Sequence, residues 1–187
     1  MIKTDIVLTD AYYIEQIREG KTECFAILLD RYSRSVFSMI VKIAGNREDA
    51  EELTQDVFIK VFRSLSSFQG NSLFSTWLYR IAYNVAVSAT RKKKHDLLAI
   101  EESMIENVSE GESSDEVEML EKEEQLIRLE RALEQLLPDE RALVTLFYMQ
   151  EKQVDEIVTI TGLSASNVKT KLHRIRKKML LLMVNSK

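Results

Sequence analysis

The stretch VDEIVTITGLSASNVKTKLHRIRKK, residues 154–178, has the pattern of two helices joined by a tight turn. Apolar residues recur three and four positions apart on both sides of Gly162, which is typical of amphipathic helices. This seam consists of Ile157, Ile160, Val168, Leu172 and Ile175. It would hold two helices at a steep angle, so we expect a helix-turn-helix with helices over about residues 154–161 and 165–184.

The face opposite this seam on the second predicted helix is basic. Lys169, Thr170, His173 and Arg174 share it, Arg176, Lys177 and Lys178 follow, and residues 157–187 contain no carboxylate side chain. Such a face suits phosphates and the acceptor-rich edges of the DNA major groove. The plainer alternative is an amphipathic C-terminal helix with a solvated basic side.

The composition favours an all-α protein. With 5 glycines and 1 proline in 187 residues, the chain has too few turn formers for a β-sandwich or barrel. The single cysteine, Cys24, excludes an internal disulfide, and two histidines argue against a zinc site, so we expect neither metal nor cofactor. No apolar run is long enough for a membrane span and the start lacks an apolar signal core, so we expect a cytoplasmic protein without membrane insertion.

The formal net charge of −4 is unevenly distributed along the chain. Counted from the sequence, residues 1–95 carry +3, residues 96–125 carry −11 and residues 126–187 carry +4. Two basic blocks around an acidic, apolar-poor segment are typical of a nucleic-acid partner and a solvated linker. We therefore expect two small helical domains, 1–95 and 120–187, joined by an acidic flexible linker over 96–119.

Turn and cap residues divide both blocks into helices. Gly45 is expected to end one helix, Asn46 to cap a second over 48–62, and Ser72 to cap a third that reaches the basic run 91–94. Pro138 suits the first turn of a helix over 139–150. The apolar stripes expected to face the core are Ala50, Leu53, Val57, Val61 and Leu65 in the first block, and Leu126, Leu129, Leu133 and Leu136 in the second.

Aromatic and basic residues alternate between Phe68 and Lys94, with no acidic residue from Gln69 to His95. Aromatic rings stack on unpaired bases, while Asn and Arg side chains can hold base edges and the backbone. By helical spacing, however, Trp77, Ile81 and Val85 could equally belong to the core. The pattern leaves both interpretations of Trp77 open.

Four motifs give the chain a family resemblance. Residues 68–84, F-x-G-x-S-x-F-x-T-W-L-Y-R-I-A-x-N, resemble the −10-reading and promoter-melting segment of bacterial extracytoplasmic-function sigma factors. Residues 49–58, DAEELTQDVF, resemble the polymerase-binding helix of that family. The motif Leu137-Pro138-x-x-x-Arg141, together with residues 157–176, resembles its −35-reading domain.

The resemblance implies a non-catalytic sigma subunit that binds core RNA polymerase, through the largest-subunit coiled coil and the flap, and directs recognition of promoter DNA. It further implies an anti-sigma factor, often membrane-bound, as a partner. The residues implied to bind polymerase are Asp49, Glu52, Gln55 and Asp56. Those implied at the −10 element are Phe68, Trp77, Arg80, Asn84, Arg91, Lys92 and Lys93. Those implied at the −35 element are Asn167, Lys169, Thr170, His173, Arg174, Lys177 and Lys178.

From the residues alone, two other interpretations stay open. The acidic helix could simply present a solvated face, and the chain could be a stand-alone helix-turn-helix regulator whose N-terminal half senses a ligand or dimerises. An enzyme has little support, because there is no Gly-rich phosphate loop or nucleophile elbow. The chain also departs from the family, since Ser164-Ala165-Ser166-Asn167 stands where a Pro and a Gly-Thr pair often open the recognition helix. The −35 sequence is therefore not predicted.

Overall fold

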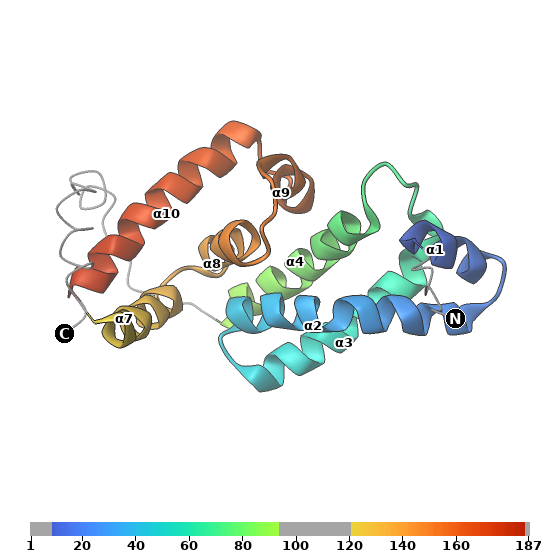
Figure 1. Cartoon of the computed structure of the whole chain (residues 1–187), viewed down its shortest axis with the longest axis horizontal. Helices are drawn as coiled ribbons and strands as arrows, with labels where there is room; N and C mark the ends of the chain where they lie inside the picture. Colours follow the sequence, from blue (N-terminus) through green and yellow to red (C-terminus); the bar gives the residue numbers. More distant parts are fainter. Residues whose placement is uncertain (1–8, 94–120, 186–187) are drawn as a thin grey trace, which may run out of the picture.

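The computed structural model describes residues 9–93 and 121–185, and within them every regular element is helical. The first group comprises α1 (Asp10–Arg18), the 3₁₀ turn η1 (Thr22–Cys24), α2 (Phe25–Ala44), α3 (Arg47–Ser64), the 3₁₀ turn η2 (Leu65–Ser67) and α4 (Phe74–Lys93). Helices α2, α3 and α4 pack against one another (Figure 1). Their shared core includes Leu28, Met39, Ile40, Val57, Val61 and Leu78. The all-α prediction is confirmed.

The turn between α2 and α3 follows from two residues. Gly45 adopts a left-handed conformation with φ 80°, and its N–H donates to the Val41 carbonyl at 2.9 Å. The next residue, Asn46, accepts a hydrogen bond from the Asp49 N–H on its side-chain oxygen at 2.8 Å. Both predicted roles, the helix end and the helix cap, are confirmed.

The second group comprises α7 (Lys122–Glu134), α8 (Pro138–Val144), the π turn η3 (Thr145–Met149), α9 (Val154–Thr161) and α10 (Ala165–Asn185). Pro138 begins α8, as predicted. Helices α9 and α10 form the helix-turn-helix, with Gly162 left-handed at φ 76° between them. The predicted seam of Ile157, Ile160, Val168, Leu172 and Ile175 is buried.

Three local predictions are wrong. The helix after the loop begins at Phe74, and the Trp77 N–H donates a hydrogen bond to the Leu73 carbonyl. Leu73 is therefore at the N-cap position, and Ser72, which was expected to cap the helix, lies one residue before it. The helix expected over 139–150 changes at Thr145 into a π turn, in which the Gln150 N–H reaches back five residues to the Thr145 carbonyl at 2.9 Å. Leu126 is 62% exposed, whereas Ala132 and Leu133, farther along α7, are the buried residues of this helix.

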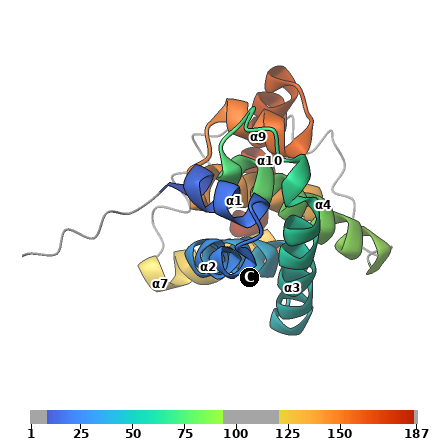
Figure 2. The same ribbon diagram turned by 90° about the vertical axis from the view of Figure 1, so that its right-hand side faces the viewer.

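The two groups pack directly on each other. Helix α4 contacts α8 and α9, and α2 contacts α8 (Figure 1). Figure 2 shows the arrangement from the end, with α9 and α10 on one side of α4 and with α2 and α3 on the other. The predicted linker over residues 96–119 lies outside the described residues.

Candidate nucleic-acid interface

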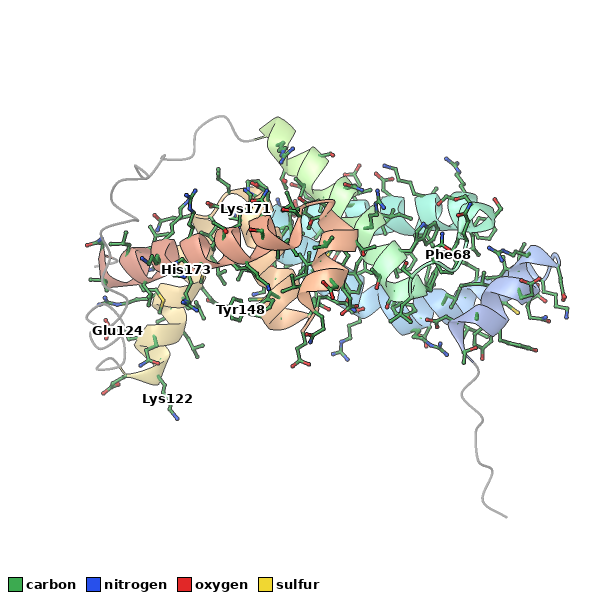
Figure 3. The ribbon with its side chains drawn as sticks, turned by 90° about the horizontal axis from the view of Figure 1, so that it is seen from above. Phe68, Lys122, Glu124, Tyr148, Lys171 and His173 are labelled. Carbon is green, nitrogen blue, oxygen red and sulfur yellow. The ribbon has the colours of Figure 1, made fainter. Side chains whose placement is uncertain are left out.

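The exposed side of α10 is a basic face. Asn167, Lys169, Thr170, His173 and Arg174 are exposed, and Lys177 is half-buried. These positions lie opposite Val168, Leu172 and Ile175, which are buried against α9 and its neighbours. Figure 3 labels His173 and Lys171 on this helix. The N-terminal half of the second helix of a helix-turn-helix is the part that enters the major groove, so this face is placed to meet base edges.

The start of α10 has an N-terminal cap that the sequence motifs did not predict. The Ser164 hydroxyl accepts a hydrogen bond from the Asn167 N–H at 3.2 Å. Ser164 therefore fixes the first turn in the way that N-cap serines do, although a Pro and a Gly-Thr pair are missing. Asn167 is left exposed beside the basic face.

Lys178 does not belong to this exposed face, contrary to the prediction. Its side chain is 7% exposed and its ammonium pairs with the Glu140 carboxylate at 2.8 Å. The same carboxylate accepts the Leu137 N–H at 2.9 Å and so caps α8. Lys178 lies three positions after the core residue Ile175, so helical geometry turns it inward, whereas Lys177 stays on the outer side. Consecutive lysines were wrongly assigned to one face.

Replacing Lys178 with methionine is expected to lower the free energy of unfolding by about 1–2 kcal/mol, because the partly buried Glu140 carboxylate would lose its ion pair. Urea unfolding of the full chain, followed by circular dichroism, measures this. Lys177→Met is the matched control and should change the free energy by less than about 0.5 kcal/mol. Equal losses for both variants would contradict the assignment of Lys178 to the interior.

The loop before α4 and the start of that helix enclose a small pocket of 240 Å³. Phe68 packs its ring on Trp77 with centroids 5.2 Å apart and on Phe74 at 5.8 Å. The Arg18 guanidinium donates to the Phe68 carbonyl and ties the loop to α1. The lining residues are Ser67, Phe68, Gln69, Asn71, Ser72, Trp77, Arg80 and, from α9, Thr159.

Trp77 lies between the core and a pocket, so its core contact is confirmed and its contact with DNA stays a prediction. Its ring is half-buried, packs against the core and lines the pocket. Trp77, Arg80, Asn84 and Arg91 follow one another at three, four and seven residues, so they share one side of α4. Arg80, Asn84 and Arg91 are exposed there. The side chains of Lys92 and Lys93 lie outside the described residues.

Helix α3 presents its acidic side to solvent, with Glu52, Gln55 and Asp56 exposed. Asp49 is different, because its carboxylate accepts a hydrogen bond from the Asn46 amide at 2.6 Å and the residue is half-buried. This residue is therefore part of the helix cap. Of the four residues implied to bind polymerase, three are available as a continuous exposed set.

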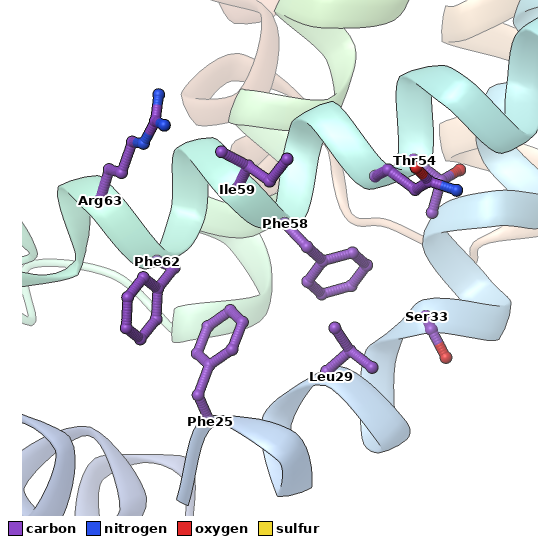
Figure 4. Close-up of a pocket in the computed structure, with 9 residues that line it drawn as sticks. Phe25, Leu29, Ser33, Thr54, Phe58, Ile59, Phe62 and Arg63 are labelled. Carbon is purple, nitrogen blue, oxygen red and sulfur yellow. The ribbon is translucent and has the colours of Figure 1, made fainter. Parts of the chain in front are cut away.

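An apolar groove of 780 Å³ runs between α2 and α3 beside this acidic side (Figure 4). Phe25 and Leu29 come from α2, and Phe58, Ile59 and Phe62 from α3. Sequence reasoning missed the groove because Ile59 and Phe62 fall off the core stripe of α3. Both residues are large and apolar although they lie outside the core stripe, and this feature of the sequence could have indicated an exposed apolar surface.

In the part of the chain that the structure describes, sites of two other kinds are absent. Within residues 9–93 and 121–185, no group of three His, Cys, Asp or Glu side chains is placed to hold a metal ion. No helix in that described part of the chain is long and apolar enough to cross a membrane.

The comparisons with known proteins cover both helical groups. Residues 28–95 match the family described as Sigma-70 region 2, and residues 126–179 match Sigma-70, region 4. The chain is 33% identical to the ECF RNA polymerase sigma factor SigW of Bacillus subtilis over 88% of this chain and 91% of that protein. It is 32% identical to the ECF RNA polymerase sigma-E factor of Escherichia coli over 91% of this chain and 92% of that protein.

Two solved structures share the fold. One is CnrH in complex with the cytosolic domain of CnrY, at 18% identity and a TM-score of 0.64, with 95% of this chain and 99% of that chain covered. The other is the sigma factor RpoE of Bartonella quintana in complex with the anti-sigma factor NepR, at 20% identity and a TM-score of 0.62, with 87% and 98% covered. At these identities the likeness describes the arrangement of helices alone.

Proposed function

Because the chain belongs to the extracytoplasmic-function (ECF) RNA polymerase sigma factors, we propose that its two helical groups divide promoter recognition between them. The similarity to SigW over almost the full length of both proteins carries this proposal. The domain boundaries we propose are 1–95 and 120–187, with residues 96–119 as the connection. The chain supplies recognition and strand capture in the cytoplasm, and the polymerase supplies the catalysis. An anti-sigma factor is the proposed regulatory partner.

The pocket before α4 is proposed to hold a base flipped out of the −10 element. Phe68 and Trp77 offer aromatic surface, Arg80 offers a cation, and Asn84 offers an amide farther along the same side of α4. A flipped base needs a stacking surface and a hydrogen-bonding edge, and these side chains supply both. Arg91, with Lys92 and Lys93, would hold the phosphate backbone beyond that base.

The basic face of α10 is proposed to read the −35 element. Asn167, Lys169, Thr170, His173 and Arg174 lie near the N-terminal half, which enters the groove, whereas Lys177 lies farther along. Base contacts specify a sequence and phosphate contacts position the protein. Arg174 and Lys169 are therefore assigned to bases, and Lys177 to a phosphate. Lys178 is left out of the set because it is buried.

Arg174→Ala, assayed as holoenzyme, is expected to relax the preference at particular −35 positions by about tenfold, the value of one good contact to guanine. Lys177→Ala should weaken all −35 sequences alike and reduce the slope of log affinity against log salt by about one. Binding is measured on a set of −35 point variants at several salt concentrations. A uniform loss in both variants would refute the division between bases and phosphates.

The proposed function itself is tested by promoter selection. Core RNA polymerase and the purified chain are mixed with a randomised promoter library, and the transcribed templates are sequenced. We expect two enriched elements at a fixed spacing upstream of the start sites. A stand-alone regulator would instead enrich duplex sites without polymerase, and that outcome would overturn the proposal.

A further inference from the structure

The loop that carries Phe68 is held by few backbone bonds of its own. It runs from the end of η2 to Phe74, and Gly70 within it adopts a left-handed conformation with φ 73°. No backbone N–H of residues 69–73 donates to a backbone carbonyl of the described residues. A segment without such bonds opens locally at little cost in free energy. The position of Phe68 in the pocket therefore depends on contacts from outside the loop.

The ring of Phe68 is held from the side of α4. It packs on Phe74 and Trp77. Phe74 is buried and packs in turn on the ring of Tyr32 from α2, with the two centroids 5.6 Å apart. These ring contacts leave the backbone on either side of Phe68 unrestrained, because each residue keeps two soft backbone dihedrals.

The backbone of Phe68, which Figure 3 labels, is held from the side of α1. The guanidinium of Arg18, in the last turn of that helix, donates a hydrogen bond to the Phe68 carbonyl. Its other terminal nitrogen pairs with the Glu15 carboxylate, one turn earlier, at 3.5 Å. Because a guanidinium presents its donors in a rigid planar fork, Arg18 can hold the carboxylate and the carbonyl at the same time.

Helix α1 is itself anchored on α2. Its first residue, Asp10, accepts hydrogen bonds from the Tyr32 hydroxyl and the Arg31 guanidinium. Burial and the bond to Asp10 raise the pKa of the Tyr32 hydroxyl, so this hydroxyl keeps the proton that it donates. In the middle of α1, Ile14 is 3% exposed and belongs to the core. Since both its first residue and its middle are held, α1 gives Arg18 a fixed support.

None of the sequence motifs includes this arginine. The segment that matches Sigma-70 region 2 covers residues 28–95, and α1 ends before it. Arg18 and Phe68 are 50 residues apart in the chain, so neither helical periodicity nor a local motif connects them. The role of Arg18 follows from its contact with the loop.

We propose that Arg18 is a positioning residue for base capture, which holds the Phe68 carbonyl so that the Phe68 ring faces the flipped base. The inference rests on the function proposed for the pocket. Arg18 acts through Phe68 and contacts neither the base nor a phosphate. A side chain in a binding site has to be held within about 0.5 Å of its working position, and a hydrogen bond from an anchored helix provides this. An exposed hydrogen bond contributes little to the stability of a fold, so its loss should impair capture and leave folding intact.

The test measures what each base contributes to the binding of a single strand by the holoenzyme. The probe is a fluorescent strand that carries the selected −10 sequence, and abasic sites replace its bases one at a time. The variant is Arg18→Met, which keeps an unbranched side chain but has no donor. The control is Lys21→Met, which removes the same charge from a nearby exposed residue that bonds to Gln16. Each affinity is divided by that of the intact strand for the same variant, so a general loss of stability cancels.

With the wild type and with Lys21→Met, we expect one position at which an abasic site weakens binding about tenfold, because stacking on an aromatic ring is lost there. With Arg18→Met, the loss at that position should fall to about twofold, because the ring is no longer held against the base. Adding Arg18→Met to Phe68→Ala should weaken binding of the intact strand no further than Phe68→Ala alone, since two residues that act through one contact are not additive.

Two results would overturn the role of Arg18. One is a tenfold loss that Arg18→Met retains at the same position as the wild type, and the other is a double variant in which the two losses add in full. An equal loss at every position with the wild type would instead refute the pocket as a base-binding site, and with it the proposed function on which this role rests.

Discussion

The Glu52→Lys/Asp56→Lys variant is expected to bind core RNA polymerase at least 100-fold more weakly than the wild type. The two carboxylates are exposed on α3, next to the apolar groove that it forms with α2 (Figure 4). Acidic groups at the edge of an apolar groove suit a helix with basic and apolar side chains, and reversed charges would face like charges on it. Close charge pairs across protein interfaces couple by about 1.5–7 kcal/mol, so two reversals suffice for a loss of this size.

Binding is measured by titrating labelled chain with core enzyme. Asp49 stays unchanged because its bond to Asn46 caps α3, and circular dichroism should then show unaltered helicity. Glu121→Lys/Glu123→Lys, which changes the net charge equally at exposed positions of the second group, is the control and should bind as the wild type does. If the α3 variant also binds normally, the polymerase docks elsewhere.

The second large effect is expected in promoter opening. Phe68→Ala/Asn84→Ala should form holoenzyme and closed complexes but open the DNA about 100-fold less well. Base stacking on an aromatic ring contributes about 1–3 kcal/mol, and the amide contact adds to it. Permanganate reactivity of the −10 thymines reports the opening.

Two further variants separate base capture from folding. Phe68 packs on Phe74 and Trp77, so Phe68→Leu, which keeps apolar volume but loses the ring, should show a smaller opening defect at a nearly unchanged melting temperature. Tyr12→Ala removes an exposed aromatic ring from α1 and should open promoters normally. Wild-type permanganate reactivity in the double variant would refute the role assigned to the pocket.

Much of the fold was predictable because single residues specify helix ends. Gly45, Asn46, Pro138 and Gly162 each have a backbone preference or a capping group that acts within a few residues, and all four lie where they were expected. The π turn after Val144 was not predictable in this way. It shifts the hydrogen-bond register by one residue, and no single side chain in Thr145–Met149 requires that shift.

The candidate site was predictable only where one helix decides exposure. The outer face of α10 follows from its own apolar spacing, but the burial of Lys178 depends on Glu140, which comes from α8. The polar partners that cover Thr76 and Tyr79 are Glu156 of α9 and Gln150 just before it, which lie 80 and 71 residues farther along the chain. Neither residue type signals burial, so contacts between the two groups could not be read from periodicity.

Run-off transcription from the selected promoter, by core polymerase with and without the chain, tests the central claim most directly. We predict that core enzyme alone gives no defined start site. Adding the chain should produce one transcript whose start lies at a fixed distance from the two selected elements, and replacing either element should abolish it. A transcript that needs only one element, or that starts equally well without the chain, would contradict the account.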